Sequence, residues 1–327
     1  MTQTTLHANS GFGRWLGKLP LGYILRRALM MLVTLWAIIT LTFIMMHAVP
    51  GGPFVSERMM APEIEAALNA KFGLDAPLWQ QYFNYLGGVL SFDLGPSFKY
   101  PGVSVNQMIA DGLAVTAQTG LLAVLAVVAV GVPLGIIAGL NRNRWPDTAV
   151  MMLATVGVAV PSYVIATVML YVFALRLGWV PTFGLDDWRG YILPVIALSG
   201  FWLSFVARLT RSSLLETLDQ DYMTTARAKG LRPGQILIKH GLRNSLIPVV
   251  TVLGPVVANL LTGSFVIEQI FALPGIGRHF VLSITNRDYT AIMGITIFYA
   301  AFLIFMIFIV DMLYLWLDPR IKLEDSE

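Results

Sequence analysis

Cysteine is absent from the 327 residues of the chain, which excludes disulfide bonds, thiol chemistry and cysteine metal sites. The four histidines are scattered, and no HExxH pair occurs. The nearest approach to a Walker A loop surrounds Gly17 and Lys18, but Phe12 occupies the first glycine position and Leu19 replaces the serine or threonine. The sequence therefore predicts neither a metal site nor an ATP site of these kinds.

Charged residues are also scarce, at 13% of the chain, where a soluble protein of this length carries about a quarter. Hydrophobic residues make up 56%, and they gather in runs of roughly twenty residues. A large buried α/β core would instead show apolar runs of about four to eight residues broken by turns. The composition predicts an all-α integral membrane protein.

Six apolar runs are candidates to cross a bilayer. Their approximate bounds are 29–49, 115–140, 148–175, 192–206, 247–265 and 290–317. The fourth is the weakest, because it is shorter than the usual ~20 residues unless it continues through Ala207 and Leu209. The first is longer than the core of a secretory signal, which has about 7 to 15 residues.

Lysine and arginine are unevenly distributed about these spans. Fifteen of the 22 lie on one side, and cytoplasmic segments keep such an excess. Both termini are therefore predicted to be cytoplasmic. The predicted segments are a cytoplasmic or interfacial N-terminal segment (1–28), a membrane domain (29–317) with an external loop (50–114) and a cytoplasmic loop (208–246), and a cytoplasmic tail (318–327).

The external loop between the first two spans is too long for a simple connection and is predicted to hold structure of its own. Ile64, Leu68 and Phe72 share one helical face, and Gly73 is a natural stop for that helix. Two interpretations stay open: a packed spacer, or a cap that contacts an external partner.

Glycine and proline occur within several of the predicted spans. Glycine recurs every four residues in the second span, which predicts a face that a neighbouring helix approaches closely, at Gly131, Gly135 and Gly139. Proline removes one backbone hydrogen bond and is predicted to kink three spans, at Pro133, Pro161 and Pro255. Such helices could move against each other, or they could simply pack tightly.

Charge within the spans is rare. Asp311 lies in the last span and Glu268 follows the fifth, whereas an ion-coupled carrier places carboxylates near the membrane midplane. Asp311 is predicted to pair with Arg26 or Arg27. Without a nucleotide site or an ion relay, the energy for any transport has to come from another subunit.

The cytoplasmic loop holds seven basic residues between Arg208 and Arg243. Its centre predicts a short helix from Tyr222 to Lys229, with Asp219 or Asp221 as N-cap. Gly230 permits the left-handed conformation that ends a helix, and Pro233 is suited to start the next one. This pattern predicts a docking loop.

Here the chain resembles the inner-membrane permease subunits of ATP-binding-cassette importers, whose cytoplasmic loop carries the EAA motif that docks into the nucleotide-binding subunit. TARAKGL and HGLRNSLIPVVT are similar to the peptide-permease version of that loop. Thr224 and Thr225 replace the glutamate and first alanine of the general motif, so no role of that glutamate transfers.

The resemblance covers nearly the whole chain beyond residue 22. QYFNYLGGVLSFDLGPSFKY, LTGSFVIEQIFALPGIGRHFV and DMLYLWLDPRI resemble stretches of the B-type subunit of oligopeptide and dipeptide permeases. SFDLGPSFKY favours the oligopeptide system over the dipeptide, nickel or glutathione relatives.

The resemblance implies the type I importer fold in the bacterial cytoplasmic (inner) membrane. It implies a homologous C-type permease partner, two ATPase subunits that hold the ATP and magnesium, and an extracytoplasmic peptide-binding protein. This chain would be non-catalytic, would contact peptide and membrane lipid, and would bind no cofactor, metal or nucleic acid. An ion-coupled secondary carrier and a membrane scaffold are the alternatives.

Two groups of residues are predicted to carry this function. Coupling to the ATPase is assigned to Tyr222, Thr225, Ala226, Arg227, Ala228, Lys229 and Gly230. The peptide pathway is assigned to Ser162, Asn259, Thr262 and Ser264, for which hydrogen bonding between packed spans is the alternative role.

Overall fold

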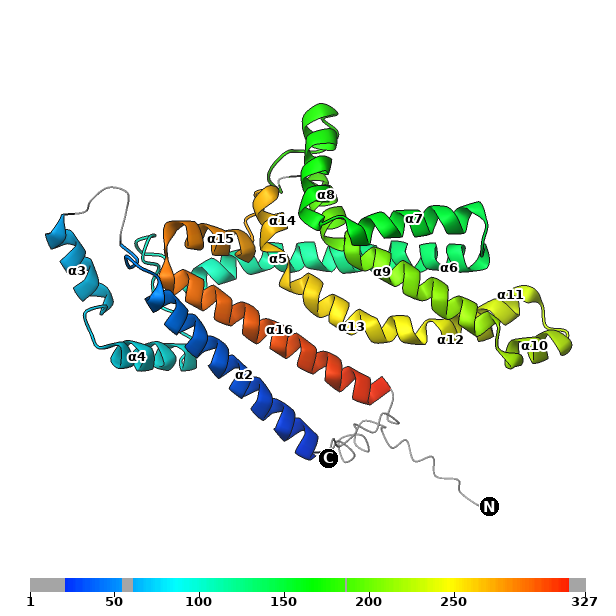
Figure 1. Ribbon diagram of the computed structural model, residues 1–327, viewed down its shortest axis with the longest axis horizontal. Coiled ribbons are helices and arrows are strands. Elements are labelled where there is room, and N and C mark those ends of the chain that lie inside the picture. Colours follow the sequence, from blue (N-terminus) through cyan, green and yellow to red (C-terminus); the bar gives the residue numbers. More distant parts are fainter. Residues whose placement is uncertain (1–20, 55–60, 186, 318–327) are drawn as a thin grey trace, which may run out of the picture.

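The computed structural model describes residues 21–54, 61–185 and 187–317 (Figure 1). Most of the predicted N-terminal segment 1–28 and all of the predicted tail 318–327 lie outside these ranges. Five helices of the described part are long and apolar enough to cross a membrane, and a strongly bent pair of helices makes a sixth candidate. The predicted all-α fold with about six spans is confirmed.

The long elements and their short 3-10 or π-helical turns (η) follow one another along the chain. They are α2 (Leu21–Ala48), α3 (Pro62–Phe72), α4 (Leu78–Leu90), α5 (Val105–Ala126), η1 (Val127–Gly131), α6 (Val132–Leu140), α7 (Trp145–Ala159), α8 (Ser162–Met169), η2 (Leu170–Arg176), η3 (Trp188–Tyr191), α9 (Ile192–Leu218), α10 (Asp221–Ala228), α11 (Pro233–Ile236), η4 (Leu237–Leu242), α12 (Arg243–Ser245), α13 (Ile247–Thr262), α14 (Phe265–Ile270), α15 (Ile276–Asn286) and α16 (Tyr289–Leu317).

Proline has different effects in the three spans that it interrupts. At Pro161 the third span breaks between α7 and α8, which meet at 105°, and α8 points in a different direction from α7 in Figure 1. Before Pro133 the helix passes through the π-helical turn η1 and then continues as α6. Pro255 lies inside α13, which remains one helix. A missing N–H therefore breaks a span only at the first of these sites.

The fourth span is much longer than the sequence predicted. Helix α9 runs on to Leu218, over 27 residues, where the prediction ended near Val206. The two arginines that suggested an end, Arg208 and Arg211, instead donate hydrogen bonds to side chains of α7. Their polar partners allow the helix to continue through the first part of the predicted loop 208–246.

Helix α9 is the central element, in contact with α5, α6, α7, α8 and α13. The predicted glycine face of the second span packs on it. A Cβ added at Gly135 would lie 2.5 Å from the carbonyl oxygen of Ala207, and one at Gly139 would lie 3.0 Å from Leu214. The close helix contact predicted from the glycine spacing is confirmed, and α9 is the neighbour that makes it.

Two helices, α3 and α4, occupy the loop between the first two spans. Helix α3 ends at Gly73 in the left-handed conformation (φ 68°), as predicted. The Phe72 ring packs against Phe98 and Phe54 with centroids 4.5 and 5.7 Å apart, which ties α3 to the loop that enters α5.

Helices α2 and α16 lie side by side at one edge of the molecule (Figure 1). Near their shared end, Arg27 Nη2 lies 2.5 Å from Asp311 Oδ2. The predicted ion pair of Asp311 is confirmed, with Arg27 as the partner.

Candidate coupling site

Helix α10 lies at one end of the molecule, where α10 and α11 project beyond α9 and α12 (Figure 1). It is held there by a small apolar cluster. Met223 and Ala226, one turn apart, are 1% and 5% exposed and pack with Ile236 of α11 and Leu218 at the end of α9. A force applied to α10 therefore reaches α9 through side chains in direct contact.

The predicted helix is present, but its start differs from the prediction. Gln220 is the N-cap and accepts no hydrogen bond with its side chain. Asp219 instead ends α9, with a carboxylate oxygen 3.7 Å from Arg142. Asp221 is the first helical residue, where its negative charge favours the helix dipole. The predicted aspartate cap is therefore wrong.

The end of the helix agrees with the prediction. Gly230 has φ 76°, and its N–H donates to the carbonyl oxygen of Arg227 at 3.0 Å. Pro233 begins α11 as its first residue, where the lost N–H costs little. A side chain at residue 230 would enter open space within this chain, so its main effect would be backbone strain.

The outer surface of this loop is formed by exposed residues that lie outside the cluster. They are Tyr222, Thr225, Arg227, Ala228, Lys229 and Gly230. Tyr222 is held in place, because its hydroxyl accepts a hydrogen bond from Asn244 Nδ2 at 3.0 Å. We call these six residues the coupling surface. Ala226, predicted to belong to it, faces inward, since its small side chain fits between α10 and α11.

A depression of about 590 Å³ adjoins the coupling surface. It is lined by Leu231 and by residues of α11 and η4, among them Ile238, whose side chain is 68% exposed. Arg232 and Lys239 also line it. An exposed apolar side chain beside cations is suited to a protein partner that supplies a hydrophobic group and negative charge.

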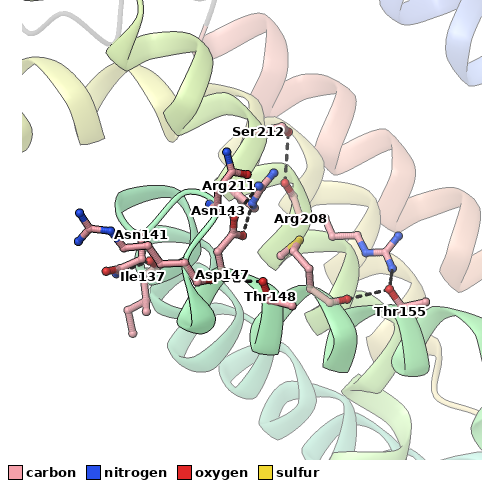
Figure 2. Close-up of polar contacts among 11 residues, drawn as sticks. Ile137, Asn141, Asn143, Asp147, Thr148, Thr155, Arg208, Arg211 and Ser212 are labelled. Carbon is pink, nitrogen blue, oxygen red and sulfur yellow. Dashed lines mark hydrogen bonds and ion pairs between the residues drawn. The ribbon is translucent and has the colours of Figure 1, made fainter.

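A buried ion pair braces α9 against α7 (Figure 2). Arg211 Nε and Nη2 donate to the two carboxylate oxygens of Asp147 at 2.5 and 2.7 Å, and the backbone N–H of Asn143 donates to the same carboxylate at 2.9 Å. The Asp147 side chain is only 5% exposed. One turn earlier on α9, Arg208 donates to the Thr155 hydroxyl at 2.9 Å.

This brace was not predicted from the sequence. Asp147 was placed just outside the third predicted span, and Arg211 was counted only among the basic residues of the loop. A single acidic residue at the start of an apolar helix, facing an arginine-bearing helix, is the pattern that would have suggested it.

Of the four predicted pathway residues, two are exposed and two have hydroxyls that bond to nearby backbone groups. Ser162 and Asn259 are exposed, although Asn259 Oδ1 accepts a hydrogen bond from Trp202 Nε1 at 3.1 Å. Thr262 donates to the carbonyl oxygen of Ala258 in its own helix at 2.7 Å, and Ser264 caps α14 by accepting from the N–H of Ile267. The last two hydroxyls therefore serve local structure.

Glu268 is a second buried carboxylate with a role that the sequence did not indicate. Its side chain accepts from the Thr116 hydroxyl at 2.9 Å and from the N–H of Gly277 at 2.8 Å. A Cβ at Gly275 would overlap this carboxylate, so glycine is needed there. Glu268 thus joins α14 to α5 and to the start of α15.

Two family models match most of the chain. A model described as "Binding-protein-dependent transport system inner membrane component" matches residues 131–323, and a model of the N-terminal component of such systems matches residues 20–111. The dipeptide transport system permease protein DppB of Bacillus subtilis is 47% identical over 301 residues, which cover 92% of this chain and 98% of the relative.

The oligopeptide transport system permease protein OppB of Escherichia coli K12 is 43% identical over 307 residues, covering 92% of this chain and 99% of the relative. Among solved structures, an inward-facing MetNI methionine ABC transporter matches with a TM-score of 0.53, covering 64% of this chain and 96% of that chain. An amino acid ABC transporter matches with a TM-score of 0.52, over 63% and 92%. Both are 17% identical and show the fold alone, which is the predicted type I importer fold.

Proposed function

The chain belongs to the family of binding-protein-dependent transport system inner membrane components, in its peptide-permease branch, and we propose that it forms one membrane half of an ATP-driven oligopeptide importer. The family predicted from the sequence is confirmed, and the chain is a multi-pass membrane protein. The other half of the pathway is a homologous C-type permease.

The energy comes from two ATPase subunits, which hold the ATP and magnesium, while this chain binds no cofactor. An extracytoplasmic binding protein delivers the peptide. This assignment is supported by the family and by the scarcity of charge in the spans. The protein lies in the bacterial inner membrane with both termini in the cytoplasm, as the distribution of lysine and arginine supports.

We base the proposal on how α10 is held, with one side exposed and the other packed against the end of α9. The coupling surface faces outward, while Met223 and Ala226 fix the same helix to the end of α9. Closure of the ATPase dimer would push on the coupling surface, and α9 would transmit the displacement to α7 through Asp147 and Arg211 and to the second span through the glycine face. The spans packed on α9 would then open the peptide pathway outward.

Arg227 and Lys229 act as polar anchors of the docking contact, and Gly230 shapes the end of α10. Ser162 and Asn259 are the pathway residues with exposed side chains, and they are proposed to contact the peptide. Thr262 and Ser264 keep only a positional role near the pathway, because their hydroxyls already bond to backbone groups of α13 and α14.

A dipeptide importer is the second candidate. The relative that is 47% identical transports dipeptides by its name, whereas the oligopeptide assignment rests on SFDLGPSFKY and on the 43% identical relative. Competition for uptake between dipeptides and peptides of four to five residues separates the two candidates.

The test of the proposal is co-purification of the chain with its co-expressed neighbours, followed by ATP hydrolysis of the reconstituted complex with binding protein and peptide. We expect a complex with two ATPase subunits and a second permease, in which peptide stimulates hydrolysis. A stable homo-oligomer whose transport responds to uncouplers and not to ATP depletion would indicate a secondary carrier instead.

A further inference from the structure

Helix α4 carries an exposed apolar face that nothing in the described part of the chain covers. Trp79, Phe83 and Leu90 lie on this face with exposed fractions of 66%, 61% and 75%, and Phe92 follows at 87%. No lysine, arginine, aspartate or glutamate occurs from Leu78 to Phe92. A patch of this kind on a helix that borders a membrane domain requires an apolar environment.

The partly buried side of α4 is fixed to α2 by polar side chains. The Tyr82 hydroxyl lies 2.8 Å from Thr40 Oγ1, and the Gln81 side chain lies 3.0 Å from His47 Nε2. The Tyr82 ring also meets Phe43 edge-on, with centroids 5.3 Å apart. These contacts set the position of α4 along α2, and Figure 1 shows α4 beside α2 at some distance from its end.

The position of Thr40 gives the depth of α4 in the membrane. After Arg26 and Arg27, the apolar part of α2 extends to Ala48, about 21 residues or about 31 Å at 1.5 Å per residue. This matches a hydrocarbon core of about 30 Å, so the boundary lies near Ala48. Thr40 is then about 12 Å inside that boundary. Tyr82 therefore reaches well below the level of the lipid headgroups.

The backbone at the end of α4 fits such a location. The N–H groups of Ser91, Phe92 and Asp93 donate to carbonyl oxygens of the last turn at 2.8 to 3.1 Å. Backbone polar groups within a bilayer have to be satisfied internally. On α2, Leu41 and Ile44, which lie beside Thr40 and Phe43 in the sequence, also have exposed apolar side chains.

We infer that α4 is embedded in the external leaflet of the bilayer, with Trp79, Phe83 and Leu90 in contact with lipid acyl chains. The occupant of this face is lipid rather than a protein, because no charged residue borders it between Leu78 and Phe92 and the Tyr82 hydroxyl of the same helix reaches Thr40, below the water boundary. The loop between the first two spans is thus anchored in the membrane by α4.

The absence of native cysteine allows a direct test. Single cysteines at Phe83, Leu90, Leu41 and Glu63 carry a nitroxide label, and the full chain is reconstituted with its co-expressed partners in liposomes. Collision rates are measured with oxygen, which concentrates in hydrocarbon, and with a neutral nickel chelate, which stays in water. Leu41 on α2 is the lipid-facing control, and Glu63, exposed on α3, is the water-facing control.

We expect the oxygen-to-nickel ratio at residues 83 and 90 to equal that at residue 41 and to exceed that at residue 63. Nickel accessibility at residues 83 and 90 equal to that at residue 63 would overturn the inference. Protection of both labels from oxygen and from nickel would also overturn it, because a protein partner would then cover the face.

Discussion

Replacing Arg211 with methionine tests the brace between α9 and α7. The substitution keeps much of the side-chain volume but leaves the Asp147 carboxylate, 5% exposed, with only the N–H of Asn143 as a donor. Removing one partner of a buried ion pair costs about 3–5 kcal/mol. The Arg211 side chain is 25% exposed, so water reaches it. We therefore expect Arg211→Met to lower the free energy of unfolding by about 3 kcal/mol, near the lower end of that range.

The double variant Asp147→Asn/Arg211→Met isolates the cause. It removes both charges, and the side-chain amide introduced at position 147 can still accept from the N–H of Asn143. Because replacing both members of a buried pair is often nearly neutral, we expect most of the lost stability to return. The control is Arg208→Met, one turn earlier on α9, which removes only a hydrogen bond to Thr155 and should cost about 1 kcal/mol.

The assay is reversible unfolding by sodium dodecyl sulfate in mixed micelles, with ATP-dependent peptide uptake measured on the same variants. Arg211→Met should lower stability well beyond Arg208→Met and should reduce uptake. Equal losses for Arg211→Met and Arg208→Met, or a double variant no more stable than Arg211→Met, would refute the role of the ion pair.

Three further predictions use the same assays. Gly135→Ala should lower the free energy of unfolding by about 1–3 kcal/mol through overpacking, because its Cβ would lie 2.5 Å from α9. Gly200→Ala, where the added Cβ meets open space, should not lower it. Equal stabilities of the two variants would contradict the close contact. Asp311→Asn should lower the free energy of unfolding by about 1 kcal/mol and weaken assembly with the other subunits. Unchanged assembly and transport would remove the basis for its ion pair with Arg27. Glu268→Gln should lower the free energy of unfolding by about 1–3 kcal/mol, since the amide nitrogen would replace an oxygen that accepts either from Thr116 or from the N–H of Gly277. Exposed Glu216→Gln is the control.

Local patterns in the sequence predicted much of the fold. Runs of apolar residues indicated the spans, the four-residue glycine spacing indicated the face that meets α9, and a lone acidic residue in a span indicated the Arg27 pair. Gly230 was correctly assigned a left-handed conformation, because few other residues adopt it readily. These features depend on neighbours within a few residues or on a simple charge rule.

Features that depend on distant contacts were missed or misjudged. The end of α9 was placed too early, because Asp147 and Thr155, more than fifty residues away, are what stabilise its arginines within the helix. Ala226 was expected on the surface, but its direction is set by the position of α11. The Glu268 network could not be predicted, since its donors come from α5 and α15.

The location of α4 illustrates the same limit. Its lack of charge was visible in the sequence, but the loop was predicted to be either a packed spacer or a cap that contacts an external partner. The contacts of Tyr82 with Thr40 and of Gln81 with His47 show how far along α2 the helix lies.

Coupling of this chain to ATP hydrolysis through α10 is decided by the variant Gly230→Val. Valine at φ 76° carries a strain of roughly 1–2 kcal/mol or more. Gly73→Val is the matched control, because that residue also has a positive φ and open space around it, on α3 far from α10. Peptide-stimulated ATP hydrolysis and uptake are measured in liposomes that contain the whole complex. We predict that Gly230→Val inserts normally but loses both activities while Gly73→Val keeps them; uptake by Gly230→Val at the unmodified rate would contradict the coupling role of α10.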